Sequence, residues 1–152
     1  MKQIIMPFYL VLTLFLAGCA TTKYQAMNPQ EITAEGIEFF ENKKFSLLDL
    51  GAGPDGSLAI ATFKSISVTS PSIPAKRLAE YIRKNKRLVV YGAGNSAAEV
   101  IIKDAFKLCI DDDLSDHKIL FVLTAAQQEQ VEEALKKSGV QFGVKLHQNE
   151  NS

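Results

Sequence analysis

Residues 88–110 have the sequence LVVYGAGNSAAEVIIKDAFKLCI, and the order of residue types in this stretch indicates the fold. The first four residues are an apolar run, which predicts a strand, and Gly92 and Gly94 predict a tight turn after it. Residues 97–110 have a helical pattern that is apolar around most of its circumference, and such a helix is normally buried. The stretch therefore predicts a strand followed by a deeply buried helix.

The same alternation continues toward the C-terminus. Residues 119–123 are wholly apolar, residues 125–137 have a narrow apolar stripe, and residues 140–146 alternate between apolar and polar or small side chains. A strand that is apolar on both faces is typical of the centre of a parallel sheet, whereas an alternating strand suits an edge. The succession from residue 88 is therefore strand, helix, strand, helix, strand, and the fold class is α/β.

Capping patterns mark the expected helix starts. Ser96 with Glu99, and Thr124 with Gln127, each match a capping box, in which the two side chains bond to each other's backbone N–H groups. Ser72 precedes a proline and predicts the N-cap of a further helix over residues 74–85.

The N-terminal part of the domain is less regular. Residues 32–50 suit either short β segments or a helix followed by a strand. Residues 51–56, GAGPDG, predict a tight turn, and residues 58–68 alternate in part, so they predict the second arm of a β-hairpin. We therefore expect a small mixed sheet with an N-terminal hairpin, within a single domain over residues 32–147.

An apolar run precedes the domain. Residues 4–16 are almost entirely apolar and have the length of a secretory signal rather than of a transmembrane helix. The run ends in Leu16-Ala17-Gly18-Cys19, which resembles the lipobox of bacterial lipoproteins. The resemblance implies that residues 1–18 are a signal peptide that is removed, and that Cys19 is acylated, with palmitate among the chains, and holds the protein to a membrane.

The segments that flank the domain are polar. In the lipoprotein family an aspartate after the cysteine is the usual sign of inner-membrane retention, so Ala20 implies the outer membrane. Residues 19–31 have no apolar period and predict a lipidated tether that keeps the domain near its leaflet, in the periplasm. Residues 148–152 predict a polar tail.

The chain is close to electrically neutral. It has 17 Lys and Arg against 17 Asp and Glu, and loss of Lys2 with the leader leaves 16 against 17, or −1. This balance does not favour nucleic acid as a partner. Once Cys19 is acylated, Cys109 is the only thiol, so no intrachain disulfide is expected. Its place on an apolar helical stripe predicts a buried, unreactive thiol.

The turn within residues 88–110 is a candidate anion site. The spacing of Gly92, Gly94 and Ala97 matches G-x-G-x-x-A after a strand and before a helix, where free N–H groups favour a phosphate or another anion. The candidate binding residues are Gly92, Gly94, Asn95 and Ser96. The alternative is a plain turn from strand to helix.

Cations are concentrated between residues 76 and 87, where Glu80 is the only acid. The six are Lys76, Arg77, Arg83, Lys84, Lys86 and Arg87. They are a candidate surface for an anionic partner, and the alternative is a solvated helix face near its C-terminal pole. The acidic residues 111–117 fail the spacing of a calcium-binding loop, and we identify neither catalytic nor metal-binding residues.

These observations predict the location of the protein in the cell in more detail than its activity. We expect an outer-membrane lipoprotein that acts without catalysis or cofactor, as a binding or assembly accessory for a larger envelope complex or surface structure. Its partners would be the membrane, through Cys19, and an envelope protein. One alternative is a periplasmic small-molecule or anion-binding domain, with hydrolytic activity as an option, at residues 92–96. Another is an immunity or exclusion lipoprotein.

Overall fold

A computed structural model describes residues 27–54 and 57–147. The predicted signal peptide, Cys19, most of the tether and the tail at 148–152 lie outside the described residues. In chain order the described elements are α2 (Pro29–Phe39), β1 (Ser46–Asp49), α3 (Ser57–Thr69), α4 (Ile73–Lys84), β2 (Arg87–Tyr91), α5 (Ala98–Leu108), β3 (Lys118–Leu123), α6 (Ala125–Lys137) and β4 (Gln141–Leu146).

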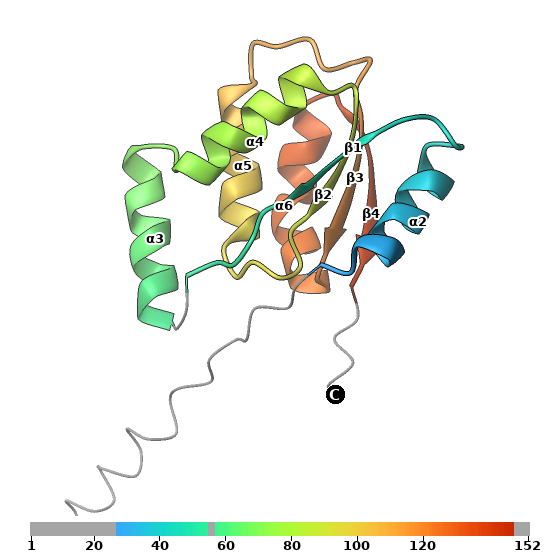
Figure 1. Ribbon diagram of the computed structural model, residues 1–152. Coiled ribbons are helices and arrows are strands. Elements are labelled where there is room, and N and C mark those ends of the chain that lie inside the picture. Colours follow the sequence, from blue (N-terminus) through green and yellow to red (C-terminus); the bar gives the residue numbers. More distant parts are fainter. Residues whose placement is uncertain (1–26, 55–56, 148–152) are drawn as a thin grey trace, which may run out of the picture.

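The described strands form one parallel sheet in the order β1-β2-β3-β4 (Figure 1). The α/β class is confirmed, but the predicted mixed sheet with an N-terminal hairpin is wrong. β3 lies inside the sheet and β4 at its edge, as their apolar patterns predicted. Parallel strands need a crossover between them, and helices α3 to α6 supply these crossovers.

The segment that was expected to be the second hairpin arm is helix α3. Ile60, Phe63 and Ser67 are its less exposed positions, and their spacing of three and four residues is helical rather than alternating. Thr62 and Ser65 donate hydroxyl hydrogen bonds to the carbonyls four residues earlier. The break in the alternating pattern of residues 58–68 therefore indicated a helix.

Helix α2 begins inside the predicted tether. Asn28 caps it by accepting from the N–H groups of Gln30 and Glu31, and Pro29 occupies its first position. The helix therefore begins three residues before the position at which the tether was expected to end. Of the two alternatives for residues 32–50, the helix followed by a strand is the one that forms.

Two apolar cores lie on the two faces of the sheet. The larger one is formed with α4, α5 and α6, and α5 is buried along most of its length as predicted. On the other face α2 covers a smaller core. Glycine makes this close approach possible, because a Cβ at Gly36 would lie 2.5 Å from the Phe45 ring and a Cβ at Gly143 would overlap the ring of Phe39.

Two of the three predicted helix starts are confirmed. Ser72 caps α4, and Thr124 with Gln127 forms the capping box of α6. The predicted box at Ser96 is wrong: the N-cap of α5 is Ala97, which has no side-chain cap. Ser96 donates its hydroxyl to Pro54 instead.

Candidate functional site

The loop after β2, predicted as an anion site, uses much of its hydrogen-bonding capacity internally. The N–H groups of Gly92 and Ala93 both donate to the carbonyl of Val122, at 2.9 and 3.1 Å. The amide of Gln127 donates to the carbonyls of Gly92 and Asn95, at 3.2 and 2.8 Å. These bonds tie the loop to β3 and to the first turn of α6.

The segment after β1 covers the same loop. Asn95 donates its side-chain amide to the carbonyl of Leu50 at 3.1 Å, and Ser96 donates its hydroxyl to the carbonyl of Pro54 at 2.8 Å. A Cβ at Gly53 would lie 2.5 to 2.6 Å from atoms of Asn95 and Ser96, so the two segments are in direct contact. The chain itself packs against the polar groups that an anion would need, and the anion site at Gly92, Gly94, Asn95 and Ser96 stays a prediction.

The strand order also bears on this loop. Nucleotide-binding α/β sheets hold their ligand in a crevice at the point where the strand order reverses. The described sheet runs β1-β2-β3-β4 without a reversal. The glycine pattern therefore lacks the crevice that usually accompanies it.

The six predicted cations do not form one continuous patch. Arg83 Nε lies 2.8 Å from Asp112 Oδ2, and Lys86 forms an ion pair with Asp116. The hydrogen bond to Asp112 raises the pKa of Arg83, and the one from Lys86 lowers the pKa of Asp116. Two of the cations are thus paired with the acidic loop that follows α5.

The other cations lie at the two ends of α4. Lys76 and Arg77 are exposed in its first turns, where the guanidinium of Arg77 lies 5.9 Å from the ring centroid of Tyr81. Lys84 and Arg87 lie at the opposite end, next to the first residues of β1 and β2.

That end of α4 borders a shallow hollow of about 240 Å³ at the amino edge of the sheet. We call it the cationic hollow, and its lining residues are Lys44, Phe45, Ser46, Lys84, Asn85, Lys86 and Arg87. Lys44 was not among the predicted residues. The only sign of Lys44 in the sequence was the Lys43-Lys44 pair directly before a strand. The sequence alone does not show that this pair lies next to Lys84.

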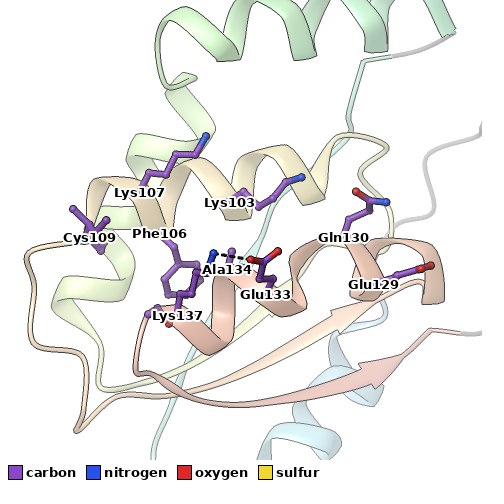
Figure 2. A pocket seen from close by; sticks show the side chains of 11 residues that line it. Lys103, Phe106, Lys107, Cys109, Glu129, Gln130, Glu133, Ala134 and Lys137 are labelled. Carbon is purple, nitrogen blue, oxygen red and sulfur yellow. Dashed lines mark hydrogen bonds and ion pairs between the residues drawn. The ribbon is translucent and has the colours of Figure 1, made fainter.

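A larger groove, of about 540 Å³, lies between α5 and α6 (Figure 2). We call it the α5–α6 groove. Its walls carry charges of both signs, with Lys103 and Lys107 on α5 and Glu129, Glu133 and Lys137 on α6. Glu133 and Lys137 form an ion pair at 2.6 Å, which lowers the pKa of Glu133. No sequence pattern predicted this groove.

Cys109 borders the groove but is buried, as predicted. Its sulfur lies 3.9 Å from the carbonyl oxygen of Ala79, and burial raises the pKa of its thiol to about 11. At neutral pH it is therefore a protonated thiol without nucleophilic character.

The acidic residues after α5 have local partners. Asp113 accepts the N–H of Ser115 at 3.0 Å, and the hydrogen bonds from Ser115 lower its pKa. Within residues 27–54 and 57–147, His, Cys, Asp and Glu side chains form no group of three that could hold a metal ion.

The chain matches no protein-family model, and neither the curated proteins nor the solved structures contain a significant match to it. Among the helices of the described residues, none combines the length and the apolarity needed to cross a membrane.

Proposed function

We propose that the chain is an outer-membrane lipoprotein, anchored through Cys19, whose domain binds an acidic envelope protein at the cationic hollow and catalyses no reaction. The hollow is the observation that carries this proposal. Lys44, Lys84, Lys86 and Arg87 line it together with one aromatic ring and two neutral polar side chains, and no carboxylate is among the lining residues. A surface of one charge sign in a nearly neutral chain selects partners of the opposite sign.

The cations of the hollow differ in their freedom to bind. Lys86 is paired with Asp116, and Arg87 donates to the carbonyl of Lys44 at 3.5 Å, near the limit of a hydrogen bond. Neither Lys44 nor Lys84 has an ion-pair partner among the described residues. An incoming carboxylate would therefore meet two lysines whose charge the domain does not neutralise.

The direction of α2 supports this arrangement. Lys118, at the start of β3, donates to the carbonyl of Phe39 at the end of α2, whereas Lys145, near the end of β4, pairs with Glu35 in its middle. Helix α2 therefore runs antiparallel to the strands, and its first turn lies near their carboxyl edge (Figure 1). The hollow is at the opposite, amino edge, so a tether from Cys19 would leave it facing away from the anchor.

The test is crosslinking in intact cells that carry the full-length chain. We expect the double substitution Lys84→Glu and Arg87→Glu to abolish the crosslink to an envelope protein, because both side chains line the hollow and neither lies in a core. The matched control is the double substitution Lys103→Glu and Lys137→Glu, which makes the same charge change in the α5–α6 groove and should leave the crosslink intact. Loss of the crosslink in the control alone would place the binding surface in the groove and contradict the proposal.

The anchor has a test of its own. Mass spectrometry of the mature chain should find residues 1–18 absent and acyl chains on Cys19. An unmodified Cys19 would contradict the lipoprotein part of the proposal whatever the crosslinking result.

A further inference from the structure

Helix α3 exposes apolar side chains on a domain whose other helices cover the sheet. Leu58 is 79% exposed, Ile66 61% and Val68 84%, and Ile73 at the start of α4 is 82% exposed. Lys64 is the only charged residue of the helix. The exposed side of α3 therefore carries three large apolar side chains between hydroxyl side chains, and no other described element covers it.

The domain holds α3 by one side only. Phe63 packs against the larger core, and Lys64 Nζ lies 2.7 Å from Glu99 Oε1 on α5. In Figure 1, α3 stands at the margin of the molecule, beside α5 and apart from the sheet. The side of the helix that faces away from α5 is therefore available to another surface.

Charge around α3 favours an anionic surface. Residues 56–79 contain no Asp or Glu, but they contain Lys64, Lys76 and Arg77. Lys64 is paired with Glu99, so Lys76 and Arg77 are the cations that could meet an anionic surface. Lys76 and Arg77 are exposed and follow the exposed Ile73 closely in sequence. Exposed apolar side chains with cations close by favour contact with a membrane that contains anionic lipids.

The attachment of the chain is consistent with such a surface. Seven residues, 20–26, separate Cys19 from Met27, two residues before α2, and the first turn of α2 lies near the carboxyl edge of the sheet. Helix α3 follows β1 and the segment that packs on the loop at Asn95 and Ser96, so its first turn is near the same edge. Seven residues span at most about 25 Å, which keeps this edge close to the anchored leaflet.

A second copy of the chain is a less favourable partner for the exposed side of α3. The 13 residues of α3 form a helix of about 20 Å, and pairing two such helices would bury less than the roughly 1,200 Å² of a stable protein interface. A lipid surface needs no matching partner of this size. We propose that α3 lies in the headgroup region of the leaflet that holds Cys19, with Leu58 toward the acyl chains and with Ile66 and Val68 on the two flanks of this side.

This inference rests on the proposed function only in taking Cys19 as the anchor. Its test uses the acylated chain, with an environment-sensitive fluorophore attached at Val68→Cys and the protein reconstituted into vesicles that contain phosphatidylglycerol. Nitroxide groups on the acyl chains should quench the fluorophore several-fold. The matched control is Ile110→Cys, because Ile110 is 79% exposed and apolar but belongs to neither α3 nor its cationic surroundings.

The outcomes separate the two proposals. Equal quenching at residues 68 and 110, in protein that co-sediments with the vesicles, would overturn the placement of α3 and leave the anchor standing. A disulfide between two copies at Val68→Cys without quenching would identify a second chain as the occupant and also overturn it. If Cys19 is not acylated, the anchor fails, and the same fluorescence measurement on the unanchored chain still decides whether α3 binds these vesicles.

The role of charge has a separate measurement. Replacing phosphatidylglycerol with phosphatidylcholine should reduce the quenching at residue 68, and so should the substitutions Lys76→Glu and Arg77→Glu. The substitution Val68→Glu, probed from Leu58→Cys, should abolish the quenching while leaving the melting temperature unchanged, since Val68 makes few contacts within the domain. Full quenching in these variants would contradict the orientation proposed here.

Discussion

Lys64 and Glu99 form an ion pair that joins α3 to the rest of the domain, with 2.7 Å between Nζ and Oε1. The two partners differ in exposure: the Lys64 side chain is 48% exposed, whereas that of Glu99 is 10% exposed. A carboxylate in this position depends on its partner, because an uncompensated charge is costly to bury. The position of α3 is therefore coupled to the first turn of α5.

The substitution Lys64→Met should loosen α3. It removes the cation but keeps the apolar stem, and it should lower the free energy of unfolding by about 1 to 3 kcal/mol, because Glu99 is left buried without its partner. Hydrogen exchange of residues 57–69 should accelerate more than exchange of the sheet. The control is Lys136→Met, whose exposed pair with Glu132 should be worth less than about 0.5 kcal/mol. Equal effects of the two substitutions would contradict the coupling.

Much of the C-terminal half of the fold could be predicted because its signals are local and agree. Residues 119–123 are apolar on both faces, and residues 125–137 begin with a capping box that the structure contains. In α3, by contrast, the local pattern of apolar residues suggested a strand, whereas the segment packs as a helix. Its exposed apolar residues weaken the helical moment, and only the tertiary contacts of Phe63 and Lys64 show which side faces the domain.

The substitution Gly143→Ala should displace α2 from the sheet. The added Cβ would overlap the ring of Phe39, and overpacking of this kind costs about 1 to 3 kcal/mol in a core. Thermal or denaturant unfolding measures the effect. The substitution Phe39→Leu should recover part of the loss in the double variant, because it shortens the side chain that the new methyl group meets. Additive losses in the double variant would show that the two positions are not in contact.

The candidate site could be predicted only in part. All six cations near α4 were predicted to form one surface, but the structure divides them, because Arg83 and Lys86 pair with acids of a loop about 30 residues away in sequence. Lys44 reaches the cationic hollow through the parallel pairing of β1 with β2, and that pairing was not expected. Long-range pairing of this kind leaves no periodic trace in a single sequence.

Gln127→Met should destabilise the loop after β2. The amide of Gln127 donates to the carbonyls of Gly92 and Asn95 and accepts the N–H of Thr124. Its replacement leaves the Thr124 N–H without this partner, whereas the two carbonyls keep their backbone hydrogen bonds from the N–H groups of Asn95 and Ala98. We expect a loss of about 1 to 3 kcal/mol in the free energy of unfolding. The control is Gln130→Met, three residues further along α6, because Gln130 is exposed and its substitution should change the free energy of unfolding by less than about 0.5 kcal/mol.

If Gln127→Met instead leaves stability unchanged and the loop gains affinity for inorganic phosphate, the internal bonds hold it closed without stabilising the domain. In that case the anion site predicted at residues 92–96 would become the better account of this loop.

The thiol of Cys109 should be unreactive in the folded chain. Its pKa rises from the usual 9.0 to about 11 because the thiolate would be buried, so at pH 8 the thiolate fraction is about a hundredfold below that of a free cysteine. Alkylation of the folded domain should be slower by at least this factor than alkylation in denaturant, since burial also blocks access. Comparable rates would contradict the burial.

The same raised pKa predicts a loss of stability in alkali. The folded state keeps its proton up to about pH 11, whereas the unfolded chain releases it near pH 9, so the contribution of the protonated thiol is complete below pH 9 and disappears as the pH rises toward 11. Other groups titrate in this range, and the comparison with Cys109→Ala separates their effect. The difference in free energy of unfolding between the two chains should be constant from pH 6 to about pH 8.5 and should shrink above pH 9. A difference that stays constant to pH 11 would mean that the thiol ionises equally in both states, which its contact with Ala79 inside the core does not allow.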